Sequence, residues 1–218
     1  MCYDARSSIQ SFAFITVTSG LLFYYGDKYD KHIALFLFVV IQMQLAEYFM
    51  WMDQECNNMN KYATYYAFFV LFIQPLSVLW GGYYFKTLNI SFYTYVILTI
   101  VHSCLFLMKI FEYSQKPGKI CSKPNKTKHL EWDFARRQND NEYIVFSVYF
   151  LCMTIPWLFM KNFKKGVLGF LFITFTFFYH FIFYKDDWKT LWCYSIRYAT
   201  ILYIFVTRWK NIMSLLTF

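Results

Sequence analysis

Seven stretches of about 17 to 23 mainly apolar residues limit the fold of this sequence more than any other feature. A helix needs about 20 such residues to cross a bilayer core about 30 Å thick. The stretches cover residues 9–25, 33–52, 62–84, 90–110, 143–160, 166–184 and 190–209. Each is apolar all round, whereas the strands of a transmembrane barrel would alternate with a period of two. The sequence therefore predicts an all-α polytopic membrane protein, a single domain (1–218) formed by a bundle of seven transmembrane helices.

The composition supports this class of protein. Hydrophobic residues make up 58% of the chain and charged residues 16%, against about 45–50% and about 25% in ordinary soluble domains. An aromatic content of 25% excludes a disordered chain. The net charge of +8 comes from basic residues that lie between the apolar stretches, which is typical of membrane loops and not of a nucleic-acid-binding face. We expect the lipid bilayer as a partner, and no nucleic acid.

Seven spans place the two termini on opposite faces of the membrane. The N-terminal face then holds the polar loop 112–142 and the sequon Asn125-Lys126-Thr127, which makes Asn125 a glycosylation candidate. It also holds four of the six cysteines, namely Cys2, Cys56, Cys121 and Cys193. Loop cysteines gathered on one face indicate an oxidising compartment and at least one disulfide among the four. Cys56 with Cys193 is the preferred pair, because each flanks a charged residue on its own helix.

The distribution of basic residues gives conflicting evidence on the orientation. The C-terminal face carries basic residues without local acids, namely Lys86, Lys161, Lys164, Lys165, Arg208 and Lys210. The loop on the N-terminal face is also basic, and the positive-inside rule counts Lys and Arg rather than net charge. The cysteines and the sequon favour an orientation with the N-terminus outside or in a lumen and the C-terminus in the cytosol.

Ionisable residues inside spans are costly and are candidates for function. Glu47, His102, His180 and Arg197 lie in four different spans, all about 6–12 Å from the N-terminal face by helical rise. Helical spacing adds polar or aromatic neighbours on the same faces, for example Gln44 and Trp51 beside Glu47. The sequence predicts a polar pocket in the outer half of the bundle, with Glu47 paired to Arg197. The alternative is a purely structural ion pair, with both histidines bonded to backbone carbonyls.

The third predicted span contains Gln74-Pro75. Proline removes one backbone hydrogen bond and usually kinks a helix. The Gln74 side chain, together with Ser77, could satisfy the freed backbone groups, and Gln74 is therefore a further candidate for the polar pocket.

Motifs of several enzyme and cofactor classes are missing from the sequence. It contains no CxxC, HExxH, GxSxG or P-loop. A lysine deep in the seventh span, which retinal attachment requires, is absent, and the Pro-Gln pair of PQ-loop sugar transporters is reversed here. A metal held by Glu47, His102 and His180 has only a weak signal, because the three positions are unlinked. We therefore expect no cofactor, and no metal site is predicted.

Three segments resemble parts of uncharacterised multi-span membrane proteins encoded by large DNA viruses. They are Glu47-Tyr48-Phe49-Met50-Trp51, Gln74-Pro75-Leu76 and Leu191-Trp192-Cys193-Tyr194-Ser195. The sequence is rich in Phe, Tyr, Ile, Asn and Lys. This amino-acid usage is typical of an AT-rich genome and suits such an origin. The resemblance implies no activity.

The preferred function is movement of a small polar solute, an ion or protons across the membrane, with Glu47 as the titratable group and Arg197 as its partner. Three alternatives stay open. One is a receptor-like protein that binds a ligand without moving it, and another is a membrane-embedded enzyme that uses Glu47 and a histidine as acid and base. The third is a viral or organellar structural membrane protein.

Overall fold

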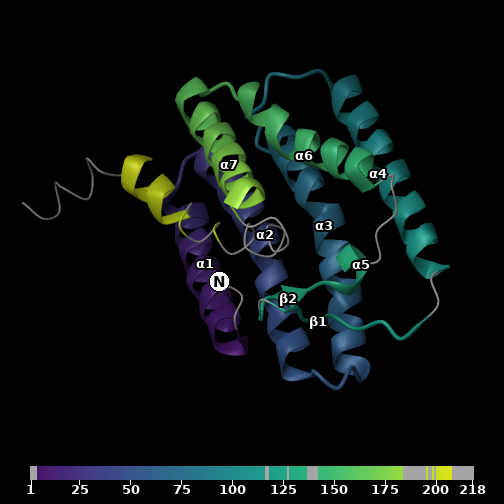
Figure 1. The fold of residues 1–218 in the computed structure, drawn as a ribbon. Coiled ribbons are helices and arrows are strands. Elements are labelled where there is room, and N and C mark those ends of the chain that lie inside the picture. Colours follow the sequence, from purple (N-terminus) through teal and green to yellow (C-terminus); the bar gives the residue numbers. More distant parts are fainter. Residues whose placement is uncertain are drawn as a thin grey trace, which may run out of the picture.

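The structure, a computed structural model, describes residues 4–115, 118–126, 128–136, 142–183, 195, 198 and 200–207. Its long helices are α1 (Ala5–Tyr25), α2 (Lys28–Met52), α3 (Asn58–Tyr84), α4 (Phe92–Ser114), α6 (Glu142–Leu158) and α7 (Phe163–Phe183). Residues 200–207 are also helical. Two short strands, β1 (Lys123–Pro124) and β2 (Leu130–Glu131), and the short helix α5 (Asp133–Arg136) lie between α4 and α6 (Figure 1). The prediction of a helical protein is confirmed.

Helices α2, α3, α4 and α7 are each long and apolar enough to cross a membrane. In α6 the apolar part is shorter, residues 146–158. Most of the predicted span 190–209 lies outside the described residues. Several helices thus have the length and composition of membrane spans, and the full count of seven stays a prediction.

Helices α1 and α2 begin earlier than their apolar stretches, because polar caps precede the apolar residues. The Asp4 carboxylate accepts a hydrogen bond from the Ser7 N–H at 2.6 Å, so α1 begins at Ala5 and not at Ile9. Asp27 and Asp30 form a capping box, and α2 therefore begins at Lys28, five residues before the apolar run. Such caps satisfy the N–H groups of the first helical turn, which have no partner inside the helix.

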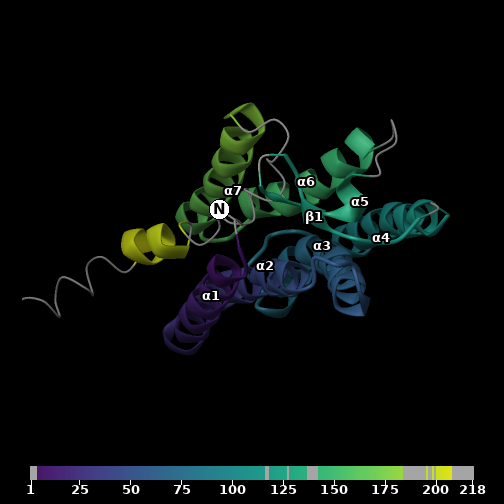
Figure 2. The ribbon, with the colours of Figure 1, turned by 60° about the horizontal axis from the view of Figure 1, so that its bottom comes forward.

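Helix α2 is central to the bundle and packs along its length against α1 and α3. Figure 2 shows α6 and α7 on one side of the layer that α1, α2 and α3 form. The larger core cluster joins α2, α3, α6 and α7 and includes Phe36, Val78, Trp157 and Ile173. A second cluster, at the other end of α2, contains Met43, Ala46 and Met50 with residues of α3.

The outer surface of the bundle is apolar as well. Large exposed side chains include Val17, Phe69, Ile97, Leu107 and Phe175, which are 52–71% exposed and lie on α1, α3, α4 and α7. A soluble protein would leave few such contiguous side chains in water. This surface is the kind that contacts lipid, and it supports an integral membrane protein.

Residues 118–126 and 128–136, which we call the cap, lie at the end of the bundle where α2 ends and α3 begins (Figure 1). We call this the cap end. The sequence predicted a polar loop over 112–142, but α4 continues to Ser114. Strands β1 and β2 then pair antiparallel, with Lys123 opposite Glu131. The turns from α1 to α2, from α3 to α4 and from α6 to α7 lie at the opposite end.

Candidate functional site

Glu47 lies in α2 below the cap and is completely buried. The side-chain amide of Gln44 donates a hydrogen bond to Oε2 at 2.7 Å, and the indole N–H of Trp132 donates to Oε1 at 3.2 Å. The contact between Gln44 and Glu47 follows from their spacing of three on one helix. Trp132 lies 85 residues further along the chain, and it was not predicted as a partner because it lies in the stretch assigned as a polar loop.

The surroundings of Glu47 are apolar. Met43, Ala46 and Met50 of α2 pack against small residues of α3, and Leu130 and Trp132 of the cap belong to the same cluster. Trp51, predicted to share the face of Glu47, packs against this cluster. Its indole N–H has no hydrogen-bond partner among the described residues. The carboxylate is therefore shielded from water by apolar side chains and held by N–H donors.

The cap is attached to the bundle through Asn60 of α3, which is completely buried. Its amide nitrogen donates to the carbonyls of Met50, Asp53 and Ser122 at 3.2, 2.9 and 2.9 Å. Its amide oxygen accepts from the Ser122 N–H at 2.9 Å. One side chain thus joins the end of α2, the start of α3 and the cap.

Further bonds extend this attachment inside the cap. The hydroxyl of Ser122 lies 2.9 Å from that of Thr64 and accepts from the Asp133 N–H at 3.0 Å. The Tyr113 hydroxyl donates to the carboxylate of Asp133 at 2.7 Å. The cap therefore contacts both α3 and the end of α4, which fixes the position of Trp132, one residue before Asp133.

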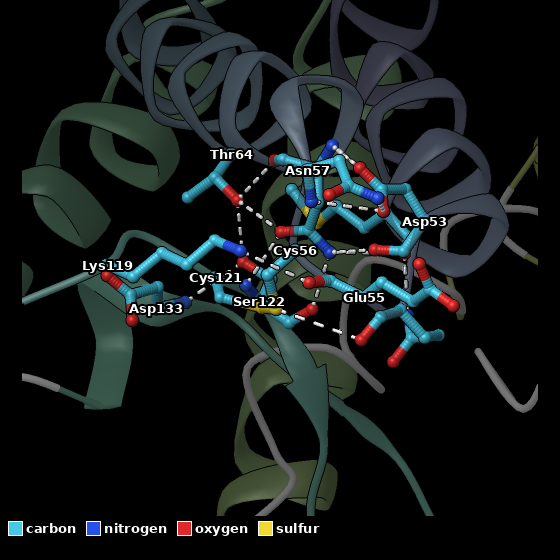
Figure 3. Close-up of a disulfide and its surroundings, with 12 residues drawn as sticks. Asp53, Glu55, Cys56, Asn57, Thr64, Lys119, Cys121, Ser122 and Asp133 are labelled. Atoms are coloured by element: carbon cyan, nitrogen blue, oxygen red, sulfur yellow. Dashed lines mark hydrogen bonds between the residues drawn. A yellow bond between two sulfur atoms is a disulfide. The ribbon is translucent and has the colours of Figure 1, made fainter.

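A disulfide between Cys56 and Cys121 also links the α2–α3 loop to the cap (Figure 3). The predicted pair of Cys56 with Cys193 is wrong, because the cap brings Cys121 against the α2–α3 loop. Cys2 and Cys193 lie outside the described residues. Cys104 and Cys152 are free thiols in α4 and α6.

Asp53, at the end of α2, accepts hydrogen bonds in the α2–α3 loop. The backbone N–H groups of Asn60 and Asn57 donate to its carboxylate at 3.0 and 3.1 Å, and the Asn57 side chain donates at 3.2 Å. These bonds, of which that from Asn60 has the largest effect, outweigh the cost of burial and hold the pKa of Asp53 below its ordinary value. The charged form of Asp53 therefore stabilises the loop that carries Cys56.

His102 and Gln74 form a second polar site, deeper in the bundle. The Nε2–H of His102 donates to the Phe72 carbonyl at 3.0 Å, and the two rings stack. The Tyr149 hydroxyl of α6 donates to the side-chain oxygen of Gln74. The side-chain nitrogen of Gln74, a buried residue, has no hydrogen-bond partner among the described residues. Helix α3 continues through Pro75, and the Ser77 hydroxyl donates to the Gln74 carbonyl at 2.7 Å.

His180 of α7 lies in a third polar site, separate from the other two. Its Nδ1–H donates to the Thr176 carbonyl at 2.7 Å, and its Nε2 lies 3.0 Å from the Ser195 hydroxyl. Both residues line an open groove of about 510 Å³ along α7, whose other walls are mainly apolar. His102 and His180 thus each bond to a backbone carbonyl, as the structural alternative expected.

Among the described residues, no hydrogen bond or ring contact joins Glu47, His102 and His180 to one another, and each has its own set of neighbours. Arg197, the fourth predicted residue, lies outside the described part of the chain. The same part contains no group of three His, Cys, Asp or Glu side chains that could hold a metal ion.

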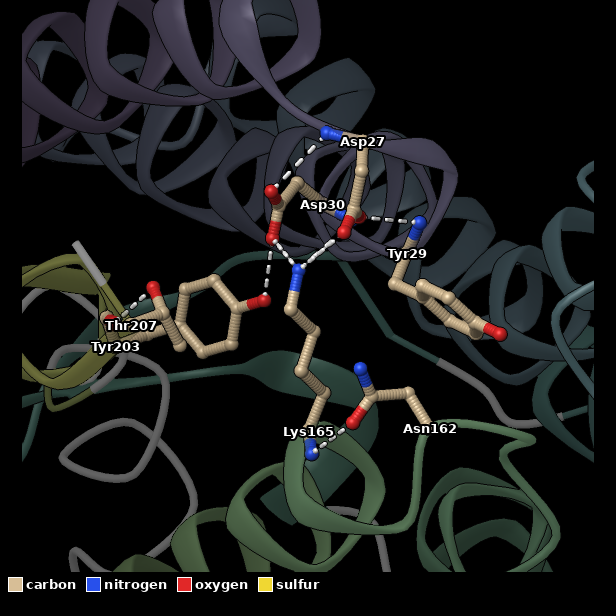
Figure 4. A network of polar contacts seen from close by, with 7 residues as sticks. All are labelled: Asp27, Tyr29, Asp30, Asn162, Lys165, Tyr203 and Thr207. Atoms are coloured by element: carbon tan, nitrogen blue, oxygen red, sulfur yellow. Dashed lines mark hydrogen bonds and ion pairs between the residues drawn. The ribbon is translucent and has the colours of Figure 1, made fainter.

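The opposite end of the bundle holds an ion-pair network (Figure 4). Lys165 of α7 contacts the carboxylates of Asp27 at 2.9 Å and Asp30 at 2.6 Å, and the Tyr203 hydroxyl donates to Asp30 at 2.7 Å. Partial burial acts to raise the pKa of Asp27. The Asp30 N–H, the Lys165 ammonium and the Tyr29 N–H outweigh this effect, so the pKa lies below its usual value. The expectation that Lys165 faces no acidic residue is wrong, because the α1–α2 turn lies beside α7.

His32, beside this network, is completely buried. Its Nε2–H donates to the Val78 carbonyl at 2.9 Å, its Nδ1 lies 2.8 Å from the Thr87 hydroxyl, and its ring stacks on Trp157. Neither His32 nor Asp30 was predicted from the sequence as a site residue, because the predicted span began at Ile33. The capping-box spacing of Asp27 and Asp30 is the signal that could have placed them in the helix.

Comparisons with protein-family models, with curated proteins and with solved structures found no match to this chain.

Proposed function

We propose that this protein moves a proton, a small ion or a small polar solute across the membrane, with Glu47 as the titratable group. The observation that carries the proposal is the complete burial of the Glu47 carboxylate inside α2, a helix long and apolar enough to span a bilayer. A charged group in such a place is costly to insert, and ionisable residues in spans commonly mark the paths of ions and protons.

Buried polar groups at greater depth support the same proposal. Gln74 lies one helical turn beyond Val70, which packs in the cluster next to Glu47, so it lies about 6 Å further into the bundle. His32 lies 15 residues from Glu47 along α2, about 22 Å further toward the opposite end. Glu47, Gln74 and His32 are each at most 1% exposed. Polar groups at successive depths are what a path through the bundle requires.

Pairing of Glu47 with Arg197 is part of this proposal. If the two side chains pair, then Glu47→Gln and Arg197→Gln each leave a buried charge without its partner. The double variant should then lose clearly less stability than the sum of the single losses, and strict additivity would contradict the pair.

The test uses purified full-length protein in vesicles that contain a pH-sensitive dye. Proton flux is driven by a potassium diffusion potential, and sodium, potassium and ammonium are tested in parallel as imposed gradients. We expect flux above that of protein-free vesicles and its loss in Glu47→Gln. Glu55→Gln, which removes an exposed carboxylate of the α2–α3 loop, is the matched control and should keep the flux.

The outcome separates transport from the alternatives. Flux that is unchanged in Glu47→Gln would contradict the role of this carboxylate. Absence of flux for all four cations in a folded, disulfide-bonded wild-type protein would contradict cation and proton movement, and would favour ligand binding or a structural role.

A further inference from the structure

Ser195 and His180 form a hydrogen-bonded pair that the proposed movement of ions does not use. Nδ1 of His180 lies 2.7 Å from the Thr176 carbonyl oxygen, which can only accept a hydrogen bond. Nδ1 therefore carries the proton of the neutral imidazole, and Nε2 is the ring nitrogen that accepts. The Ser195 hydroxyl, 3.0 Å from Nε2, is then the donor of this contact. The three groups form one chain of hydrogen bonds, from a hydroxyl through an imidazole to a carbonyl oxygen.

This order of groups is the one that activates a serine hydroxyl as a nucleophile. Serine is a weak nucleophile until an adjacent base accepts its proton, and the base needs a third group that holds its orientation. In a Ser-His-Asp triad a carboxylate holds the imidazole with its proton on Nδ1, and here the Thr176 carbonyl does so. The sequence has no GxSxG motif, but such sites are defined by geometry and occur on unrelated folds.

The pair lies in an open groove of about 510 Å³, which His180, Ser195 and Tyr198 line at one end. The α7 residues of the lining are spaced by three and four, so they share one face of the helix. Leu168 of this face lies 12 residues before His180, which corresponds to about 18 Å along the helix. The walls between them are mainly apolar and include Leu171, Phe172, Phe175 and, from the helical segment 200–207, Leu202.

The position of the pair on α7 suits an ester that lies in a bilayer. Helix α7 has 21 residues and is long and apolar enough to cross the hydrocarbon core, so each of its ends lies near one edge of that core. His180 is three residues before Phe183, the last residue of α7, and thus about 5 Å from this end. A lipid has its ester groups at the edge of the core and its acyl chains inside. An acyl chain that lies in the groove therefore brings its ester to Ser195.

We propose that this groove is the active site of an esterase that cleaves acyl esters of membrane lipids, with Ser195 as the nucleophile and His180 as its base. The inference goes beyond the proposed function and does not depend on it, because Glu47 and the pair have separate neighbours. It also differs from an enzyme built on Glu47 and a histidine, since the proposed chemistry uses no carboxylate.

The reaction consumes only the ester and water. The Ser195 oxygen forms a bond to the ester carbonyl carbon while its proton passes to Nε2 of His180. The bond from that carbon to the alcohol oxygen then breaks, and His180 gives the proton to the leaving alcohol. Water attacks the acyl-serine in the same way, its proton passes through His180 to the Ser195 oxygen, and a fatty acid leaves. The charge that develops on the carbonyl oxygen needs hydrogen-bond donors, and the groove lining contains two tyrosines, Tyr179 and Tyr198.

The experiment uses a long-chain alkyl fluorophosphonate, which forms a bond to a serine oxygen that a base has activated and loses fluoride. Purified full-length protein in detergent micelles is treated with this probe, and peptide mass spectrometry locates the adduct. We expect an adduct on Ser195 in the wild type and its loss in Ser195→Ala. His180→Gln keeps the serine and removes the base, and should lower the rate of adduct formation about 100-fold or more.

Two controls separate the chemistry from folding. Ser114→Ala removes an exposed hydroxyl at the end of α4, which donates to the Phe111 carbonyl, and should leave the rate unchanged. The Cys56–Cys121 bridge and the thermal unfolding curve show that each preparation is folded. Absence of an adduct on Ser195 in the folded wild type would overturn the proposal without the use of any variant. An unchanged rate in folded His180→Gln would overturn the role of the histidine.

The length of the acyl chain tests the substrate class. Hydrolysis of the p-nitrophenyl esters of acetate and decanoate is followed by release of nitrophenolate. We expect the wild type to cleave the decanoate with a kcat/KM at least about tenfold higher, because its chain lies against the apolar walls. Leu171→Trp fills part of the groove and should remove this preference, whereas Leu107→Trp, at an exposed position of α4, should keep it. Equal cleavage of both esters by the wild type would overturn a lipid substrate.

The esterase and the proposed transport fail separately. Ser195→Ala should carry the same flux as the wild type, and Glu47→Gln should form the adduct on Ser195 at the wild-type rate. An adduct on Ser195 without flux in the wild type would support the esterase and contradict transport. Flux without an adduct would do the reverse.

Discussion

At the scale of single residues, Asn60 connects the end of α2, the start of α3 and the cap through four hydrogen bonds. Buried polar side chains are tolerated only when such bonds replace those made with water. Both ends of the amide are used, since the nitrogen lies within hydrogen-bond distance of three carbonyls and the oxygen accepts from the Ser122 N–H and the Thr64 hydroxyl. Only a side chain with a donor and an acceptor at the same place can do this.

Replacing Asn60 by Asp keeps the shape and removes the donor. The new carboxylate would face the carbonyls of Met50, Asp53 and Ser122, so we expect a loss of about 3 kcal/mol in the free energy of unfolding, from unsatisfied buried groups. Thermal unfolding of the purified protein measures it. Asn58→Ala, at an exposed position of the same helix, should change stability by less than about 0.5 kcal/mol. Equal effects would contradict the role of Asn60.

Asp53 makes the cap end sensitive to acid. Its folded pKa lies below the ordinary value of 3.8 because backbone N–H groups bond the carboxylate. The stability that it contributes is therefore present above pH 3.8 and is lost as the pH falls through the folded pKa. We expect unfolding curves of the wild type to lose stability below that pH more steeply than those of Asp53→Asn. Parallel curves for the two proteins would contradict this.

At the scale of elements, α2 and α3 approach closely where His32 meets Gly81. A Cβ on Gly81 would lie 2.8 Å from Cδ2 of His32 and 3.2 Å from a methyl group of Leu35. The absence of a side chain therefore allows the imidazole to reach the Val78 carbonyl between the helices. Gly20 of α1 differs, because nothing lies within 4 Å of the place of its Cβ.

These two glycines give opposite predictions for the same substitution. Gly81→Ala should destabilise the protein by about 1–3 kcal/mol, the usual cost of overpacking. Gly20→Ala should stabilise it by up to about 1 kcal/mol, because Ala is the better helix former and meets no neighbour. Thermal unfolding of the two variants and of the wild type measures both changes in stability. A loss of stability in Gly20→Ala would show a contact on this face of α1.

At the scale of the whole molecule, the two ends of the bundle differ in chemistry. The cap end carries the disulfide and Asn125, which lies in the turn between β1 and β2. The opposite end carries the network of Asp27, Asp30 and Lys165. A disulfide forms and persists in an oxidising compartment. The predicted orientation places this end, with Cys56–Cys121, outside or in a lumen, and it stays a prediction.

The orientation is tested by modification from each side. In a eukaryotic host, Asn125 should acquire a glycan, seen as a mass change that Asn125→Gln removes. Lys164→Cys, at an exposed position of the opposite end, should not react with an impermeant maleimide added outside intact cells, and should react after permeabilisation. Reaction of Lys164→Cys in intact cells would reverse the orientation.

The sequence by itself determined the helical class and the rough position of each long helix. The length and composition of an apolar stretch are local properties, and they decide whether a segment can lie in a bilayer. The predicted helix starts were less accurate, because caps are polar and lie outside the apolar run. The second span, for example, was predicted to begin at Ile33, whereas α2 begins at Lys28. The contact of Gln44 with Glu47 could also be read from helical spacing.

Only the tertiary structure decided which distant residues meet. The bond between Trp132 and Glu47 joins positions 85 residues apart, the disulfide joins positions 65 apart, and the contact of Lys165 with Asp30 spans 135. Local patterns can show that a cysteine or a carboxylate needs a partner, but they do not rank the candidates, so Cys193 was chosen for Cys56. The choice depends on how the cap folds back on α2 and α3. That packing is a property of the whole chain and not of any segment of it.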